Sequence, residues 1–186
     1  GDYSDAGRLL DFARDVSVVT FEFENVDPAP LRPLADAVPL FPPLTALEPG
    51  QDRIAEKSFA DELGGRTAPW AAVGSLAELQ SALATIGTPS ILKTVRFGYD
   101  GKGQARLKSL EDAEAAWEAI GRQSAILEGF VRFDHEFSLI VARDQNGSIA
   151  FWDVPENTHK DGILAVSSVP APDAIRQQVP AARALA

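Results

Sequence analysis

The stretch "KTVRFGYDGKGQ", residues 93–104, decides how the middle of this sequence folds. It sets Gly98, Gly101 and Gly103 around the cation Lys102, and glycines let backbone N–H groups approach anionic oxygens closely. The stretch therefore suits a loop that binds phosphate. Its spacing matches neither the G-x-x-x-x-G-K-S/T nor the G-x-G-x-x-G motif. A glycine-rich hairpin turn between two strands explains the same residues equally well.

The neighbouring sequence puts this loop between two strands of a small sheet. From Thr67 to Val131 the pattern predicts the order β-α-β-β-α-β, in which helices cover one face of an antiparallel sheet. Both predicted helices begin with a serine cap and end at a glycine. The predicted strands are residues 67–73, 89–96, 103–109 and 124–131, and the predicted helices are residues 75–87 and 109–121.

The flanking segments predict two further pieces of an α/β fold. The first piece alternates helix and strand, which is typical of the end of a parallel α/β layer. Its predicted elements are helix 4–15, strand 16–23, helix 28–37 and strand 38–42, followed by a proline-rich linker over 39–49 and helix 51–64. The second piece begins a new antiparallel sheet. Its predicted elements are a hairpin over 135–154 that turns at Asn146-Gly147, a loop over 155–162, a strand over 162–170 and a final helix.

Composition excludes several classes of function. The formal net charge is −10, so the chain is a poor general binder of nucleic acid. It has no cysteine, which removes disulfides, thiolate zinc sites and cysteine nucleophiles. No apolar run approaches the ~18 residues of a membrane span. We therefore expect a cytoplasmic protein without nucleic-acid or membrane partners.

Three groups of polar residues outside the glycine loop suit a nucleotide. The interrupted strand end Glu128–Val131 leaves backbone groups for an adenine edge, although a β-bulge explains it as well. Glu136 could accept hydrogen bonds from a ribose, or simply face outward on an alternating strand. Arg53 and Lys57, one helical turn apart, could reach a phosphate or form a solvated basic face.

The two histidines do not point to a metal or hydrolase site. Neither His135 nor His159 forms an H-E-x-x-H motif, and the chain contains no G-x-S-x-G elbow. His159 lies in "PENTHKDG", residues 155–162, where a carboxylate, an amide, an imidazole and a lysine fall close together. Sequence alone leaves the role of this polar segment open.

The order of these segments resembles a known family. "FEFENV", "QDRIAEK", "ILKTVRFGYDGKGQ", "ILEGFVRFDHEFSLIVAR" and "VPENTHKDGIL" follow one another as in the ATP-grasp ligases. The sequence is most similar to the N5-carboxyaminoimidazole ribonucleotide synthases among them, from about residue 18 to residue 172. The resemblance implies an ATP-grasp α/β fold, ATP and Mg²⁺ as cofactors, and a homodimer as the full-length protein. It also implies small-molecule substrates, aminoimidazole ribonucleotide and bicarbonate.

The resemblance also implies a role for individual residues. Arg53 and Lys93 would contact the phosphates of ATP, the loop 98–104 would close over them, and Glu128 would face the exocyclic amine of adenine. Glu136 would hold the ribose. The implied ATP-binding residues are Arg53, Lys93, Gly98, Tyr99, Asp100, Gly101, Lys102, Gly103, Gln104, Glu128, Gly129, Phe130, Val131, Glu136 and His159.

The reaction implied by the resemblance is an ATP-dependent carboxylation in purine synthesis. ATP phosphorylates bicarbonate to carboxyphosphate. This intermediate, or the carbon dioxide that it releases, then carboxylates the exocyclic amine of the ribonucleotide. Lys102 and His159 are the implied catalytic residues, and Tyr99 and Asp100 the implied contacts to the ribonucleotide. Phe97 departs from the family pattern, because many relatives have a glycine there.

The resemblance predicts a division of the chain and leaves two other functions open. Residues 1–42 would be the end of a Rossmann-like layer, 43–66 a connecting helix, 67–131 the small ATP-grasp subdomain and 132–186 the first part of the large one. The chain has no methionine and stops within "PAARALA", so we expect an internal piece of a longer protein, inactive alone. We expect no metal ligands within it, with those for Mg²⁺ beyond Ala186. A sister ligase with another acceptor and a non-catalytic nucleotide-binding module are the alternatives.

Overall fold

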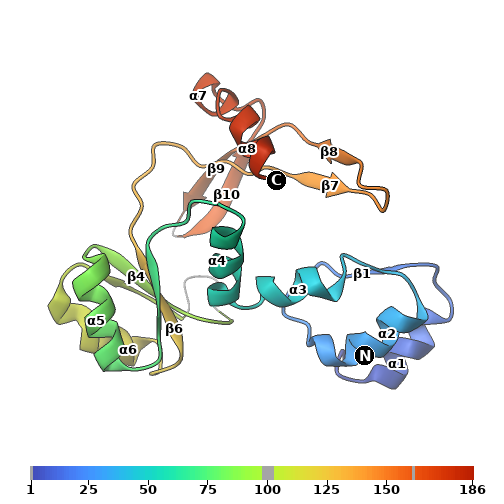
Figure 1. Cartoon of the computed structure of the whole chain (residues 1–186), viewed down its shortest axis with the longest axis horizontal. Helices are drawn as coiled ribbons and strands as arrows, with labels where there is room; N and C mark the ends of the chain where they lie inside the picture. The colour runs from blue at the N-terminus through green and yellow to red at the C-terminus, as the bar shows by residue number, and fades with distance from the viewer. Residues whose placement is uncertain (1, 98–102, 161) are drawn as a thin grey trace. The chain divides into compact units, whose positions relative to one another are not determined.

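The computed structural model describes residues 2–97, 103–160 and 162–186. These residues form two compact units (Figure 1). The first unit comprises the described residues up to 129, and the second unit comprises the described residues from 130 to the end. The described residues of the first unit form two clusters of buried apolar side chains, and those of the second unit form a third cluster.

The first unit begins with a small parallel layer. Its elements are α1 (Ala6–Ala13), β1 (Val19–Thr20), α2 (Pro28–Ala37), β2 (Leu40–Phe41) and α3 (Leu44–Gly50). Asp5 and Asp27 cap α1 and α2 by accepting backbone N–H groups of the first turn. Strands β1 and β2 pair in parallel, which confirms the predicted parallel arrangement. Leu31, Leu34 and Leu47 anchor the core of this layer.

Two predictions for this layer are wrong in detail. The strand predicted over residues 16–23 is limited to β1, since β2 offers only two residues for pairing. The proline-rich segment predicted as a linker contains the helix α3. Pro43 precedes the first turn of that helix and Pro49 lies in its last turn, so most of its N–H groups remain available. Burial of Leu47, which is 3% exposed, favours the helix.

The rest of the first unit is a four-stranded sheet with helices on both of its faces. Its elements are α4 (Arg53–Glu62), β3 (Trp70–Val73), α5 (Leu76–Ile86), β4 (Ser90–Thr94), β5 (Gln104–Leu107), the 3₁₀-helix η1 (Leu110–Asp112), α6 (Ala113–Ala119) and β6 (Ala125–Gly129). The strands lie in the order β3-β6-β4-β5, and all neighbours are antiparallel. The β-α-β-β-α-β order predicted from the sequence is therefore confirmed.

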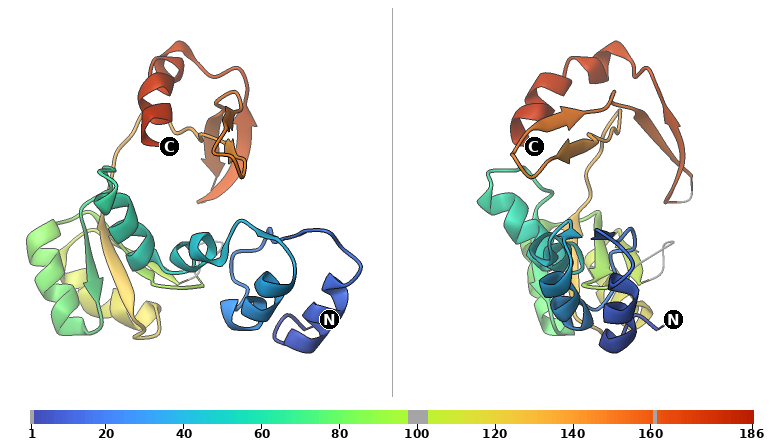
Figure 2. Two further views of the ribbon diagram at one scale, coloured as in Figure 1. Left: turned by 45° about the vertical axis from the view of Figure 1, so that its right-hand side comes forward. Right: turned by 90° about the vertical axis from the view of Figure 1, so that its right-hand side faces the viewer.

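The two faces of this sheet have different partners. Ala125 and Leu127 of β6 pack into the core with α5 and α6, through residues such as Leu83 and Trp117. Ile126 and Glu128 alternate to the opposite face. Helix α4 lies against that opposite face, while α5 and α6 lie together on the first (Figures 1 and 2). Glu128 is thus a carboxylate on a strand whose other face is entirely apolar.

The C-terminal end of α4 is held to β3 by polar contacts. Asp61 accepts hydrogen bonds from Trp70 Nε1 and from Thr67 Oγ1, each at 2.9 Å. At the other end of the helix, Asp52 caps the first turn by accepting the N–H groups of Ile54 and Ala55. The Arg53 N–H also donates to Val95 O at 3.1 Å, so both ends of α4 are tied to neighbouring segments of the sheet.

The second unit consists of two hairpins and two short helices. Its elements are β7 (Val141–Arg143), β8 (Ile149–Phe151), β9 (Glu156–Lys160), β10 (Ile163–Ser168), α7 (Asp173–Arg176) and α8 (Val179–Leu185). Strand β7 pairs with β8, and β9 pairs with β10, both antiparallel. Val154, Ala171 and Ile175 form the buried core of the unit.

Three details of the second unit differ from the sequence predictions. The residues predicted as the loop 155–162 include strand β9, which gains a full ladder with β10. The strands of the hairpin predicted over 135–154 are limited to β7 and β8. Before them, Phe137 forms an isolated bridge with Glu156, and Ile140 O accepts the N–H of Trp152 at 3.1 Å. The loop between β7 and β8 comprises residues 144–148, whereas the sequence predicted a two-residue turn at Asn146-Gly147. Asp144 Oδ1 accepts the N–H groups of Asn146 and Ser148, and this side-chain cap stabilises the longer loop.

The segments on both sides of the glycine-rich loop have left-handed backbone. Phe97 has φ of 61° and Gly103 has φ of 66°. A bulky residue such as phenylalanine rarely adopts this conformation, which glycine adopts without strain. The Arg96 guanidinium lies 5.7 Å from the centroid of the Phe97 ring, a cation–π contact that helps to hold the side chain.

No helix within the described part of the chain is long and apolar enough to span a membrane. 

Gly103 gives the first testable prediction. A Cβ at this position would lie 2.7 Å from Thr94 Oγ1 and 3.3 Å from Thr94 Cγ2, and Thr94 is buried. Gly103→Ala should therefore lower the free energy of unfolding by about 1–3 kcal/mol, through this clash and the left-handed backbone. Chemical denaturation followed by circular dichroism measures the change.

Gly50→Ala is the matched control. Gly50 ends α3, and a Cβ there would meet nothing within 4 Å. This substitution should change the free energy of unfolding by no more than about 1 kcal/mol. Equal losses of stability in the two variants would contradict the predicted clash.

Candidate functional site

The candidate site in the first unit is built around Glu128. Its carboxylate is 7% exposed and accepts contacts from two lysines. Lys93 Nζ lies 2.5 Å from Oε2, and Lys57 Nζ lies 3.1 Å from Oε1. Each carboxylate oxygen therefore has its own cation. We call Lys57, Glu128 and Lys93 the lysine–glutamate cluster.

The sheet register explains why Lys93 reaches Glu128. Glu128 pairs with Ile91 of β4, and Lys93 pairs with Ile126 of β6. Lys93 and Glu128 are therefore diagonal neighbours on one face of the sheet, within reach of a long side chain. Lys57 comes from α4 on that same face, one helical turn after Arg53. The three charged groups come from three different elements.

The cluster keeps Glu128 ionised. Burial by itself raises the pKa of the Glu128 carboxyl. The hydrogen bonds and charges of Lys93 and then Lys57 outweigh that effect, so the pKa of Glu128 is lower than its ordinary value. At neutral pH the cluster contains one anion and two cations. Its net positive charge favours an anionic ligand nearby.

Arg53 joins the start of α4 to the end of β4. Its backbone N–H donates to Val95 O at 3.1 Å, and its guanidinium donates to Thr94 O at 3.1 Å. Residue 95 lies just before the glycine-rich loop. Arg53, predicted to contact phosphate, is therefore brought to the same strand end as Lys93.

Gln51 connects the "FEFENV" segment to the same strand end. Its side chain is buried, and Nε2 donates to the backbone oxygens of Glu24 and Val26, each at 2.6 Å. Oε1 accepts a hydrogen bond from the Arg96 guanidinium at 2.6 Å. The structure thus brings together three segments that the family resemblance singled out: 21–26, 51–57 and 93–96.

The glycine-rich loop itself is largely outside the described residues. This applies to the predicted site residues Gly98, Tyr99, Asp100, Gly101 and Lys102. The loop is followed by Gly103, whose carbonyl accepts the N–H of Thr94 at 2.8 Å, and by Gln104, which pairs with Lys93 in the sheet. The two ends of the predicted phosphate loop therefore start from neighbouring strands, next to Lys93.

The predicted adenine hinge, Glu128–Val131, lies at the end of β6. The prediction that the backbone of Glu128–Val131 is unpaired is wrong for two residues. Glu128 pairs with Trp70 of β3 and Ile91 of β4, and Gly129 pairs with Ser90 of β4. The N–H of Gly129 also donates to Pro69 O at 2.8 Å. The strand ends there, and Phe130 and Val131 continue beyond the sheet, with Val131 51% exposed. Of the predicted hinge, Val131 is the residue that lies exposed beyond the strand.

The second unit contains two neighbouring histidine–glutamate pairs. Nδ1 of His159 lies 3.1 Å from Oε1 of Glu136, and Nδ1 of His135 lies 2.7 Å from Oε1 of Glu156. The N–H of Asn157 donates to the carbonyl of Glu136 at 2.8 Å, which fixes β9 beside the segment that contains Glu136. Glu136 and His159, both predicted nucleotide contacts, are therefore neighbours.

No metal site is found in residues 2–97, 103–160 and 162–186, where no group of three or more His, Asp or Glu side chains could hold an ion. The described carboxylates near the candidate sites are each paired with a lysine or a histidine. These residues do not fit a Mg²⁺ ion, which prefers several oxygen ligands.

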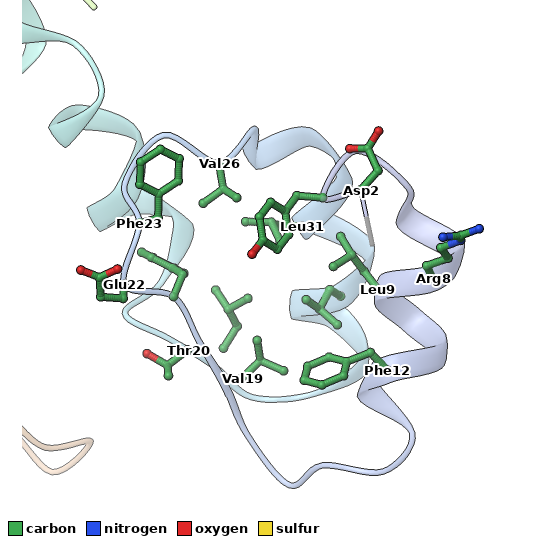
Figure 3. Close-up of a pocket in the computed structure, with 14 residues that line it drawn as sticks. Asp2, Arg8, Leu9, Phe12, Val19, Thr20, Glu22, Phe23, Val26 and Leu31 are labelled. Atoms are coloured by element: carbon green, nitrogen blue, oxygen red, sulfur yellow. The ribbon is translucent and has the colours of Figure 1, made fainter. Parts of the chain in front are cut away.

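A separate cavity of about 490 Å³ lies in the parallel layer of the first unit (Figure 3). Most side chains that line it are apolar, and Figure 3 shows Leu9, Phe12 and Val19 turned inward. Its lining includes neither Arg53 nor any member of the lysine–glutamate cluster. It is therefore distinct from the predicted nucleotide site.

Comparison with known proteins assigns the family. A model of the ATP-grasp domain matches residues 58–186. The chain belongs to the ATP-grasp family. A model described as the ribonucleotide synthetase preATP-grasp domain matches residues 1–51. The α/β ATP-grasp fold predicted from the sequence is confirmed.

Individual relatives agree with this assignment. The N5-carboxyaminoimidazole ribonucleotide synthase of Brucella melitensis is 49% identical over 171 residues, which cover 91% of this chain and 47% of that protein. The crystal structure of the N5-carboxyaminoimidazole ribonucleotide synthetase from Thermus thermophilus is 43% identical with a TM-score of 0.89, covering 100% of this chain and 50% of that one. A carboxyaminoimidazole ribonucleotide synthase from Aspergillus clavatus complexed with ATP is 26% identical with a TM-score of 0.88, again covering 100% and 50%. The chain thus spans about half the length of the relatives it matches, and the predicted resemblance to these synthases is confirmed.

Sequence reasoning missed two features of this ATP-grasp chain. Lys57 was expected either to reach a phosphate or to belong to a solvated face, but its side chain is only 21% exposed and pairs with Glu128. The buried Gln51 was not singled out. Its position immediately before the helix cap Asp52 was the available signal, because a residue there can reach back to an earlier loop.

Glu128→Gln tests the electrostatics of the cluster. Because folding lowers the pKa of Glu128, the ionised carboxyl stabilises the folded chain above its ordinary pKa of about 4.3. That stabilisation is lost as the pH falls through the lower folded-state pKa. At neutral pH the variant should be less stable than wild type by about 1–3 kcal/mol, because two lysines lose their anion. The difference should shrink as the pH falls below about 4.

Urea unfolding at a series of pH values measures this difference, with Glu62→Gln as the control. Glu62 is an exposed carboxylate at the end of α4. Its replacement should leave stability nearly unchanged at every pH. A Glu128→Gln difference that is independent of pH would contradict the assignment of charge to this carboxyl.

Proposed function

We propose that this chain is the ATP-binding part of a ligase that carboxylates aminoimidazole ribonucleotide with bicarbonate. The observation that carries the proposal is the lysine–glutamate cluster beside the backbone that follows Gly129. The similarity to N5-carboxyaminoimidazole ribonucleotide synthases over nearly the whole chain supports the choice of reaction. One relative's structure is described as a complex with ATP.

Adenine recognition would use the end of β6. The adenine edge presents an amine donor next to a ring-nitrogen acceptor, so it needs one acceptor and one donor from the protein. Glu128, ionised at neutral pH, supplies the acceptor for the amine. The backbone of Val131, which lies exposed beyond the end of β6, would supply a neighbouring polar group. Because Gly129 has no side chain, it would let the adenine ring approach the backbone closely. Its N–H is not part of the proposed contact, since it donates to Pro69 O.

Phosphate binding would use the cations at the end of β4. Lys93 lies beside Glu128, and the guanidinium of Arg53 lies at the end of β4 on Thr94 O, so these two cations are the proposed phosphate contacts. Their positive charge suits a triphosphate, and preorganised cations lower the barrier to phosphoryl transfer by stabilising the developing charge. The loop residues Gly98–Lys102, with Gly103 and Gln104, are proposed to close over the phosphates. Lys102 is proposed as the catalytic cation.

The predicted ribose contact Glu136 and the predicted catalytic residue His159 both lie in the second unit. In the described structure they contact each other, and a carboxylate with a histidine partner is held in one orientation. We propose that Glu136 binds the ribose hydroxyls and that His159 lies near the reacting groups. Tyr99 and Asp100 are proposed to contact the aminoimidazole ribonucleotide, which would select this acceptor among those of other ligases.

The proposed chemistry has two steps. An oxygen of bicarbonate attacks the terminal phosphorus of ATP, which breaks the bond to ADP and gives carboxyphosphate. The exocyclic amine then attacks the carboxyl carbon of carboxyphosphate and displaces phosphate, or it attacks the carbon dioxide that forms when carboxyphosphate breaks down to carbon dioxide and phosphate. In either case the amine nitrogen loses a proton as the new C–N bond forms. The protein contributes positioning and exclusion of water, since carboxyphosphate hydrolyses readily.

Further properties belong to the proposal through the resemblance alone. They are the use of Mg²⁺, a homodimeric full-length protein, a cytoplasmic location and the division of the chain at residues 42, 66 and 131. Because the described residues do not fit a metal ion, no step above depends on one.

The proposal is tested by assaying ADP release from the full-length gene product. ADP should appear only when ATP, bicarbonate and aminoimidazole ribonucleotide are all present. Release with a different acceptor would favour a sister ATP-grasp ligase. Absence of release with any acceptor, despite ATP binding, would favour a non-catalytic nucleotide-binding module.

Lys93→Ala in the full-length gene product tests the role of the cations. We expect ATP affinity to fall by about tenfold or more, because one charge-assisted contact is lost, while the circular dichroism spectrum stays unchanged. Isothermal titration calorimetry measures the affinity. Lys108→Ala, which removes an exposed lysine after the edge strand β5, is the control and should bind ATP normally. Unchanged affinity in Lys93→Ala would refute the assignment.

A further inference from the structure

The lysine–glutamate cluster contains one more cation than the predicted site requires. The resemblance assigned roles to Lys93 and Glu128 but none to the lysine of α4. Yet Lys57 is the less exposed of the two lysines, with 21% of its side chain accessible against 28% for Lys93. An ammonium group withdrawn from water to this extent needs a partner. Its partner is Oε1 of Glu128, at 3.1 Å.

The two lysines differ in what else they can reach. Lys93 lies on β4, opposite Gln104 at the far end of the glycine-rich loop. It can leave Oε2 of Glu128 for an anion bound near that loop. Lys57 lies in α4, whose first turn is tied to the end of β4 by the Arg53 N–H on Val95 O and whose last turn is tied to the start of β3 by Asp61. Lys57 therefore stays with Glu128 when a ligand draws Lys93 away.

The consequence concerns the carboxylate that remains. Departure of Lys93 frees Oε2 as an acceptor, but it also removes the closest cation from a buried anion. A buried carboxylate without a cation tends to take up a proton. Lys57 on Oε1 prevents this and leaves Oε2 as an oriented, charged acceptor.

We propose that Lys57 is a positioning residue that keeps Glu128 ionised and aimed at the exocyclic amine of adenine while Lys93 binds phosphate. This inference rests on the proposed function, because it requires that ATP binds here. It adds a residue that acts through Glu128 and does not itself touch the nucleotide.

The surroundings of Glu128 make Lys57 the main remaining source of charge. Among the described residues, the groups that shift the pKa of Glu128 are Lys93 on β4 and Lys57 on α4. On the third neighbouring element, β3, Glu128 pairs with Trp70, and on β4 it pairs with Ile91. Neither of these two side chains titrates. Loss of Lys57 should therefore make nucleotide binding sensitive to acidic pH.

The test compares ATP binding by wild type, Lys57→Met and Lys57→Arg in the full-length gene product. Isothermal titration calorimetry is run from about pH 8 to about pH 5.5, where an unpartnered buried carboxyl begins to protonate. Affinities are expressed as the ratio to wild type at each pH, which cancels the titration of ATP itself. Lys108→Met is the exposed control.

Lys57→Met should bind ATP about tenfold more weakly than wild type at the alkaline end. The ratio should grow further as the pH falls. Lys57→Arg should restore both the affinity and the pH profile to near those of wild type, since it restores the cation. Lys57→Gln, which keeps an N–H donor without a charge, replaces the methionine variant if that one does not fold, and should show the same pH dependence.

Two results would overturn the inference while ATP binding by wild type persists. One is an unchanged affinity in Lys57→Met. The other is a weakening by the same factor at every pH, which would indicate a purely structural contact. Absence of ATP binding by wild type would instead refute the proposed function, and the inference with it.

Discussion

The contact of one buried carboxylate with two lysines is the constraint on which the candidate site depends. Glu128 lies on a strand whose other face is packed under α5 and α6, so its position is fixed by the core. Its charge must be balanced locally, because burial of an isolated anion is costly. Lys93 and Lys57 balance it from two further elements. The same contact therefore aligns α4, β4 and β6 and leaves a net positive charge at their meeting point.

Hydrogen bonds close to this cluster connect the neighbouring segments of the first unit to one another. Arg53 bonds to the end of β4 through both its backbone and its guanidinium, and Gln51 joins the "FEFENV" segment to Arg96. Gly103 has close backbone and side-chain neighbours in Thr94, which sets where the glycine-rich loop returns to the sheet. The residues of the ATP-grasp resemblance are thus held together by polar contacts across α4 and β4, rather than only by the apolar core.

Much of the fold could be predicted from the sequence, and the failures have identifiable physical causes. The antiparallel order of the small sheet followed from period-2 strands and from helices bounded by serine and glycine. Helix α3 was missed because four prolines in residues 39–49 suggest a break, whereas burial of Leu47 favours a turn of helix. The predicted two-residue length of the hairpin turn was wrong, because the Asp144 side chain caps a longer loop. The pairing of Lys57 with Glu128 joins elements far apart in the chain, and residue spacing carries no information about such a contact.

The central claim is that ionised Glu128 recognises the exocyclic amine of adenine. The most direct measurement compares the affinities of the full-length gene product for ATP and for inosine triphosphate by calorimetry. The two nucleotides carry the same phosphates and ribose, but inosine has an oxygen where adenine has the amine. We predict that ATP binds at least about tenfold more tightly, because the oxygen would face the carboxylate without a hydrogen to donate. Equal affinities for the two nucleotides would contradict the account.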